Sequence, residues 1–326
     1  MLSCKPVRTR PSQTEPAADQ SVLDWLLAGD VSIQYQVHRD LLDDDEARLR
    51  ARIAREGWGA RFLAHRNPDG TWGRGFYQPK WTNSHYTLLD LKTLAAAPDH
   101  PLLRESVHRI AREEKADDGG ICPAESVGVS DVCVSGMFLN YASYFGEPEA
   151  ELHSIVDFLL QEQMGDGGFN CYSNRSGARH SSLHSTLSVI EGIDEYARNG
   201  YRYRRRELEQ AAADSREFIL LHRLFKSDHT GAIIRKDFLR FSFPSRWKYN
   251  ILRALDYFQA AGVPWDERMA DAAAVVLAKR NRRGRWPLPA AHPGLVHFSM
   301  EVPGQDSRWT TLLALRVVRA YGAHFS

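Results

Sequence analysis

The feature that most constrains how this chain can fold is a short turn motif that recurs along it at a regular spacing. Five copies are present, at residues 67–73 (Asn-Pro-Asp-Gly-Thr-Trp-Gly), 116–121 (Ala-Asp-Asp-Gly-Gly-Ile), 163–169 (Gln-Met-Gly-Asp-Gly-Gly-Phe), 227–232 (Ser-Asp-His-Thr-Gly-Ala) and 281–286 (Asn-Arg-Arg-Gly-Arg-Trp). The shared glycines Gly70, Gly119 and Gly167 are 49 and 48 residues apart, and the next two gaps are 64 and 53. A period near fifty accommodates two helices of about fifteen residues each with two loops.

The residues of the motif are typical of a helix stop. Glycine reaches positive φ without steric cost, and the aromatic or aliphatic residue after it can fasten the turn onto the preceding helix. Six apolar runs each follow residues that are typical of a helix start. We expect the six helices to begin at Ser32, Asn83, Ser130, Ser182, Ser245 and Ser307. These helices are apolar on most faces, whereas a helix before a turn, such as residues 152–160, is amphipathic. The pattern predicts an all-α (α/α)6 toroid with a central cavity.

Composition narrows the class of protein. The 326 residues include 42 basic and 41 acidic side chains, so no field of one charge sign exists to attract nucleic acid or an anionic membrane. The basic run at residues 202–206 is followed by acidic residues and is expected to be a solvated helix face. Nothing approaches the roughly 18 apolar residues of a membrane helix. Four cysteines are too few for a disulfide framework, which favours a cytoplasmic location. We expect residues 1–20 to be a disordered polar tail and residues 21–326 a single toroid domain.

The recurring turns resemble the repeat of the squalene cyclase and protein prenyltransferase β-subunit superfamily, which ends in a Gln-x-x-Asp-Gly-x-Trp pattern. The resemblance covers about residues 22–322. It implies an α/α toroid enzyme, a terpenoid cyclase or prenyltransferase, acting on an isoprenoid or other bulky apolar substrate in the central cavity. Two features depart from the family: the chain lacks the Asp-x-Asp-Asp acid of the cyclases, and it has one barrel where they usually have two.

The resemblance also implies a zinc site. Prenyltransferase β subunits hold zinc through Asp-x-Cys at one inner helix and His at a later one, which matches Asp131, Cys133 and His184 here. Three protein ligands would leave the fourth tetrahedral position open. A helix N-terminus is expected to lower the cysteine pKa. The alternatives are that Asp131 only caps its helix and the other two residues belong to the core, or that Cys171 and His180 join or replace these ligands.

Other candidates lie near the same helix starts. Six residues are expected at corresponding positions facing one mouth of the ring: Tyr35, His85, Cys133, His184, Lys248 and Trp309. The expected substrate-binding residues are Trp81, Tyr35, Trp247, Lys248, Tyr249, Arg308 and Trp309, with Arg246 as a further cation. Asn83, His85 and Tyr86 are similar to the constellation of toroidal polysaccharide lyases. Three hypotheses therefore stand: an isoprenoid enzyme that is zinc-dependent or not, a non-catalytic ligand-binding toroid, and a polysaccharide lyase. The oligomeric state stays open.

Overall fold

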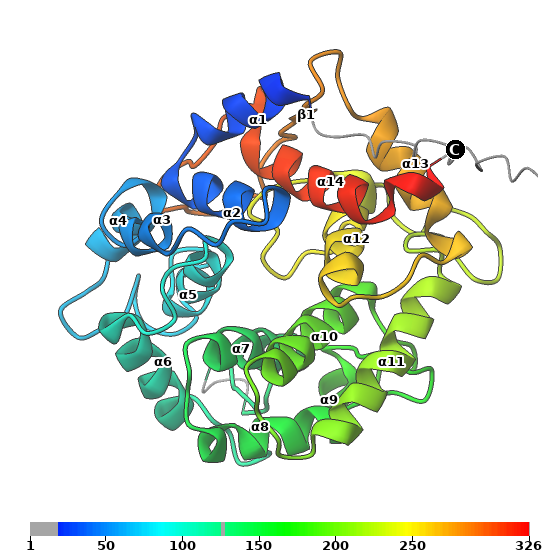
Figure 1. Cartoon of the computed structure of the whole chain (residues 1–326). Helices are drawn as coiled ribbons and strands as arrows, with labels where there is room; N and C mark the ends of the chain where they lie inside the picture. The colour runs from blue at the N-terminus through cyan, green and yellow to red at the C-terminus, as the bar shows by residue number, and fades with distance from the viewer. Residues whose placement is uncertain (1–18, 125–127, 326) are drawn as a thin grey trace, which may run out of the picture.

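The computed structural model describes residues 19–124 and 128–325, which form a closed ring of paired helices (Figure 1). Of the expected disordered tail, residues 1–18 lie outside the described residues. Asp19 and Gln20 already belong to the fold, because the Asp19 side chain caps the first helix, α1 (Gln20–Leu27). None of the helices in the described part of the chain has the length and apolar character needed to cross a membrane.

Inner and outer helices alternate along the chain. The inner ring consists of α2 (Val31–Leu41), α5 (Ser84–Thr93), α7 (Val132–Tyr144), α10 (Leu183–Arg198), α12 (Ile251–Ala260) and α14 (Arg308–Tyr321). The outer ring consists of α1, α4 (Gly57–Ala64), α6 (Pro101–Glu113), α8 (Glu149–Gln161), α11 (Arg205–Leu221) and α13 (Ala270–Ala278). Helix α14 packs against α2 and closes the ring, so the predicted toroid is confirmed.

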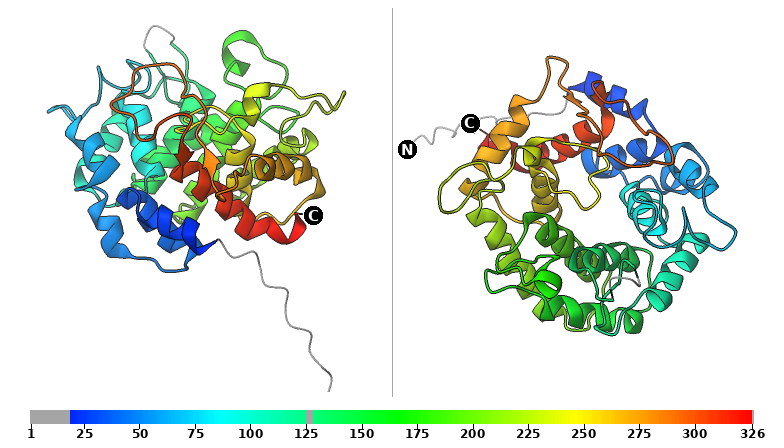
Figure 2. Two further views of the ribbon diagram at one scale, coloured as in Figure 1. Left: turned by 90° about the horizontal axis from the view of Figure 1, so that it is seen from above. Right: turned by 180° about the vertical axis from the view of Figure 1, so that it is seen from behind.

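The remaining elements are short. They are α3 (Ala47–Arg52), α9 (Ser173–Ser176), three 3-10 helices (Lys236–Leu239, Glu267–Met269, Gly322–His324), and the antiparallel two-residue strands β1 (Trp286–Pro287) and β2 (Asp306–Ser307). The long loops 223–250 and 288–304 lie on one side of the ring, the side of the inner-helix N-termini (Figure 2). They face the viewer when the ring is seen from behind.

The turn motif stops the outer helices as predicted. All five shared glycines have positive φ, between 70° and 88°. Trp72 and Trp286 follow two of these glycines, and both indoles are fully buried. The Trp72 Nε1–H donates to the Phe62 carbonyl at 2.8 Å, and the Trp286 Nε1–H donates to the Val276 carbonyl at 2.7 Å. Each indole thus satisfies a carbonyl in the last turn of the outer helix that precedes it.

A second link joins the turn to the next inner helix, and sequence analysis missed it. The backbone N–H after the turn donates to a hydroxyl in the first turn of that helix. The pairs are Trp72 to Ser84, Ile121 to Ser135, Phe169 to Thr186 and Trp286 to Thr311, at 2.9–3.0 Å. Because these hydroxyls are buried, four of the five turns fix the register of the next inner helix in this way.

Three of the six expected helix starts are confirmed and three are wrong. Asn83, Ser182 and Ser307 are the N-cap residues of α5, α10 and α14. The first and third inner helices are instead capped by Asp30 and Asp131, whose side chains accept backbone N–H groups. The fifth begins after Asn250 rather than at Ser245. A helix cannot begin directly after Ser245, because Arg246 has φ of 53°, in the left-handed region.

Helices α7 and α10 pack closely together because glycines lie at their contact. A Cβ atom on Gly192 of α10 would lie 2.3 Å from the Gly136 carbonyl oxygen of α7. A Cβ on Gly136 would lie 2.7 Å from the Val189 Cα. Any larger side chain at either position would therefore push the two helices apart.

Candidate functional site

The centre of the ring holds a cavity of about 810 Å³, to which every inner helix contributes. Most of its lining comes from the C-terminal halves of these helices. Residues 243–246, from the loop before α12, line it from the N-terminal side. The exposed side chains Asp43, Arg198 and Arg319 mark its rim at the helix C-termini. The cavity therefore opens at the mouth opposite to the one that the sequence analysis expected.

The lining of this cavity is charged. Asp, Glu, Arg and Lys make up fourteen of its twenty-nine residues. Several are held in ion pairs between inner helices. Arg253 of α12 pairs with Glu191 of the neighbouring α10 at 2.5 Å, and Arg316 of α14 pairs with Asp40 of the neighbouring α2. Lys92 of α5 pairs with Glu195 of α10 at 2.9 Å, past α7. An apolar substrate would remove these groups from water without replacing their hydrogen bonds. The lining is therefore mixed, because these charged pairs lie beside apolar side chains such as Leu89, Phe243 and Trp309.

The burial of one cavity carboxyl, that of Asp90 on α5, is only partly compensated by contacts with polar or charged neighbours. The residue is 4% exposed, and its Oδ2 lies 3.6 Å from Arg246 Nη2 without a hydrogen-bond partner. Burial raises the pKa of Asp90 to about 6, although the nearby Arg246 guanidinium opposes the change. Sequence analysis missed Asp90, although an aspartate inside the apolar run of α5 was a visible signal.

Arg246 is held in place by an aromatic support. Its guanidinium carbon lies 4.6 Å from the centre of the Trp81 indole ring, and the Trp81 Nε1–H donates to the Pro293 carbonyl at 2.7 Å. Trp81 was expected to bind substrate, but it is 1% exposed and does not line the cavity. Its indole instead supports the arginine that faces Asp90.

Two further cavity carboxyls have raised pKa values. Burial raises the pKa of Asp194 on α10, and one of its oxygens, Oδ2, has no hydrogen-bond partner. Burial also raises the pKa of Asp256 on α12, against the opposing effect of Arg316 at 3.5 Å. Three inner helices thus each bring to one cavity a carboxyl that holds its proton more tightly than usual. Carboxyls with a raised pKa in a cavity are candidates for an acid–base role.

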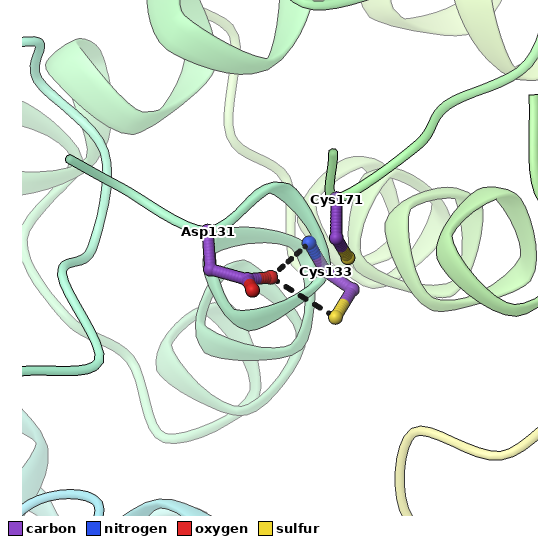
Figure 3. A group of neighbouring side chains, drawn as sticks. All are labelled: Asp131, Cys133 and Cys171. Carbon is purple, nitrogen blue, oxygen red and sulfur yellow. Dashed lines mark hydrogen bonds between the residues drawn. The ribbon is translucent and has the colours of Figure 1, made fainter. Parts of the chain in front are cut away.

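A second group of reactive side chains lies at the start of α7 (Figure 3). An oxygen of Asp131 and the sulfurs of Cys133 and Cys171 all lie within 4.8 Å of one another. The Cys133 thiol is 3.1 Å from Asp131 Oδ1, and the Cys171 sulfur is 3.0 Å from Ser185 Oγ. Arg175 forms an ion pair with Asp131 Oδ2. The structure therefore brings Cys171 to the two residues that the sequence analysis paired with His184.

The expected activation of Cys133 by the helix N-terminus is wrong. The Cys171 thiol beside it, burial and the Asp131 carboxylate together raise the pKa of Cys133 well above its ordinary value. The neighbouring thiol, burial and the carboxylate each disfavour the thiolate. Cys122 lies outside this group, and Cys4 lies outside the described residues.

His184 lies apart from the thiol group. Its Nδ1 accepts the Tyr249 backbone N–H at 2.8 Å, and its ring packs edge-on against Phe238 and Trp247. Burial, assisted by the charges of Arg235 and Lys248, lowers the pKa of His184 to about 4. Neither His184 nor His180 belongs to the group of candidate metal ligands around Cys133 in the described residues.

The three residues that are similar to those of polysaccharide lyases form structural contacts. Asn83 caps α5. His85 is fully buried with its Nδ1 3.2 Å from the Tyr141 hydroxyl, and burial lowers the pKa of His85 to about 3. The Tyr86 hydroxyl lies 2.9 Å from the Tyr77 hydroxyl. None of the three lines the central cavity, so the structure does not bring them to a common substrate there.

The other predicted substrate-binding residues do not lie together in one site. The Tyr35 hydroxyl donates to Asp45, and the Tyr249 hydroxyl donates to the Leu224 carbonyl. Arg308 packs on Trp25 of α1, whereas Lys248 lies over Trp247 in the loop before α12. Among the six residues expected at one mouth, only Trp309 lines the cavity, where it stacks on Phe243 at 4.4 Å. The expected register is wrong at Tyr35, which lies in the second turn of α2.

Comparison with known proteins adds information on the fold only. No protein-family model matches the chain, and no curated protein matches it in sequence. Among solved structures, a protein from Actinoplanes is similar over 95% of this chain and 100% of its own, with 18% identity and a TM-score of 0.50.

Two further solved structures are more distant. A glycosyl hydrolase family 88 protein from Bacteroides vulgatus covers 96% of this chain and 93% of its own, with 11% identity and a TM-score of 0.46. A type II terpene cyclase from Scytonema covers 81% of this chain and 96% of its own, with 13% identity and a TM-score of 0.33. At these identities, what the chain shares with known structures is the helical toroid fold, and its function must be argued from its own residues.

Proposed function

We propose that this protein is an enzyme that binds a polar, hydroxyl-bearing substrate in the central cavity and uses Asp90 as the proton donor. The observation that carries the proposal is the state of Asp90: a buried carboxyl in a charged cavity, with one oxygen that lacks a hydrogen bond. A carboxyl with a pKa of about 6 keeps its proton in mildly acidic solution and releases it to a leaving group.

The lining favours a polar substrate. A ligand with many hydroxyl groups would replace the water around the cavity's arginines and carboxylates with hydrogen bonds of its own. An isoprenoid would not, so the finer prediction from the resemblance is the weaker one. Sugars have this chemistry, and their glycosidic oxygen needs a proton as the bond breaks. The proposed reaction is therefore cleavage of a glycosidic bond.

Glycoside cleavage uses two carboxyl groups with different roles. Asp90 on α5 is the proposed acid. Asp194 on α10 is the proposed second carboxyl, because it lines the same cavity from another helix and also has an oxygen without a hydrogen bond. Arg246 is the proposed positioning residue, since its charge limits how far the pKa of Asp90 rises.

A prenyltransferase-like function is the second candidate, and the group around Cys133 is the observation that favours it. It would require an anionic isoprenoid to reach the N-terminal side of the ring, where the thiols lie. The two candidates use different ends of the inner helices: the carboxyls belong to the cavity lining and the thiols do not. They can therefore be tested separately.

The test is a comparison of wild type with Asp90→Asn and Asp194→Asn on a panel of chromogenic aryl glycosides and uronides. Each variant should retain binding, measured by calorimetry, and lose turnover by at least about a hundredfold, the usual contribution of a proton donor. A non-catalytic toroid would bind a saccharide equally well in all three forms without turnover. Turnover by Asp90→Asn at the wild-type rate, or binding of farnesyl diphosphate with no binding of any saccharide, would refute the proposal.

A further inference from the structure

The group of Asp131, Cys133 and Cys171 serves no purpose in the proposed glycoside cleavage. It lies where α7 begins and where the loop before α10 passes it, and none of its members lines the central cavity. Two thiols and a carboxylate within 4.8 Å of one another are the donor atoms that zinc and similar ions prefer in proteins. These three side chains are therefore candidates to bind one ion together.

We propose that this group binds one soft divalent cation of the Zn²⁺ type through the sulfurs of Cys133 and Cys171 and one oxygen of Asp131. Bonds of about 2.3 Å to sulfur and 2.0–2.2 Å to oxygen place tetrahedral ligands about 3.5–4 Å apart. Asp131 Oδ1 and the Cys133 sulfur, at 3.1 Å, are already near this separation. A small movement of the Cys171 side chain would complete a three-ligand site with its fourth position open to solvent or another ligand.

The surroundings hold the ligands in place before an ion arrives. Asp131 Oδ1 accepts the backbone N–H groups of Cys133 and Val134, and this orients the carboxylate at the start of α7. The loop that carries Cys171 is tied to the same point, because Arg175 pairs with Asp131 and Asn174 Nδ2 donates to the Ser130 carbonyl at 3.0 Å. Such supporting contacts are typical of protein metal sites.

The charges also balance. Two thiolates and one carboxylate carry three negative charges, which the divalent ion and the Arg175 guanidinium neutralise together. Without the ion, both thiols are protonated and neutral, and the Asp131–Arg175 ion pair has no net charge. The site can therefore gain an ion in exchange for two protons without leaving an uncompensated buried charge.

The ligand set differs from the one implied by the family resemblance. There the third ligand would be His184, but its Nδ1 is engaged by the Tyr249 N–H and its ring is packed between two aromatic side chains. Cys171 takes its place. A site with two sulfurs is softer than one with sulfur and nitrogen, so it should favour Cd²⁺ over Co²⁺ more strongly.

The test uses the full chain, freed of metal with a chelator and kept reduced with a phosphine, and titrates it with Cd²⁺. One ion should bind per chain and give the ultraviolet thiolate-to-cadmium charge-transfer band, which Zn²⁺ should abolish by competition. Cys133→Ser and Cys171→Ser should each weaken binding by at least about tenfold and halve the band. Cadmium-113 NMR of the wild type should report two sulfur ligands, which does not depend on any variant folding.

Two variants are matched controls. Cys122→Ser removes a thiol outside the group, and His184→Gln removes the ligand expected from sequence; both should bind Cd²⁺ as the wild type does. The inference is overturned if no stoichiometric band forms, if Cys171→Ser binds like wild type, or if His184→Gln abolishes binding. None of these readouts involves Asp90 or sugar turnover, so failure here leaves the proposed glycoside cleavage untouched.

Discussion

Replacing Asp90 by asparagine should change the pH dependence of the protein's stability in a defined direction. Asparagine keeps the size of the side chain but cannot ionise. In the folded protein the pKa of Asp90 is raised from 3.8 to about 6, because the carboxyl is buried. The folded state therefore binds the Asp90 proton more tightly than the unfolded state, and the wild type has a stability advantage at low pH that it loses as pH rises.

The size of the change follows from the two pKa values. Each pH unit of difference between folded and unfolded states corresponds to about 1.4 kcal/mol, so the full effect is about 3 kcal/mol. About 2 kcal/mol of this falls between pH 4.5 and pH 7.5. The attraction between Arg246 and the ionised carboxylate is already contained in the pKa of about 6, because the guanidinium lowers that pKa. The free energy of unfolding of the wild type minus that of Asp90→Asn should therefore fall by about 2 kcal/mol across this range.

Urea unfolding followed by tryptophan fluorescence measures this difference, because several indoles are fully buried. Asp40→Asn is the matched control with the opposite sign. Burial raises the pKa of Asp40, but Arg316 and Arg39 outweigh it and the net pKa is lowered. The wild type should therefore gain stability over Asp40→Asn as pH rises. A difference for Asp90→Asn that stays constant, or grows with pH, would show that the pKa of Asp90 is not raised in the folded protein.

Three further predictions concern the cavity and the ring. Arg246→Gln should raise the pKa of Asp90 by about one pH unit or more, since a guanidinium at 3.6 Å favours the carboxylate; carbon-13 NMR of the labelled carboxyl would measure it, and an unchanged pKa would contradict it. Gly192→Ala should destabilise the fold by roughly 1–3 kcal/mol in denaturant unfolding, while Gly165→Ala, where an added Cβ meets nothing within 4 Å, should be close to neutral. Trp286→Phe should cost roughly 1–3 kcal/mol through the lost indole hydrogen bond and volume, and a cost near zero in thermal unfolding would show that the indole does not fasten the repeat.

The ring itself could be predicted from sequence because its signals are local. A glycine that must adopt positive φ and the large apolar residue after it lie within three residues of each other, and the turn repeats at a period that fits two helices. Helix starts were predicted less well. The observed caps Asp30, Asp131 and Asn250 lie one to five residues away from the serines that were predicted as caps. Several nearby residues can cap a helix, and tertiary packing selects among them.

The site could not be predicted in the same way. Asp90 and Arg246 lie side by side in the cavity lining although they are 156 residues apart in the sequence, and only closure of the ring brings them together. Which end of the ring is open was also decided by packing, because the loops 223–250 and 288–304 lie over the N-terminal side.

The sequence by itself therefore determined the architecture and the period of this protein, through turn chemistry and apolar pattern that act over a few residues. It also marked Asp131 and Cys133, which are neighbours on one helix start. Only the tertiary structure decided that Cys171 rather than His184 joins them, and that a carboxyl within α5 is buried beside an arginine. A side chain's neighbours across the ring set its dielectric surroundings and its partners, and those neighbours come from helices far apart in the sequence.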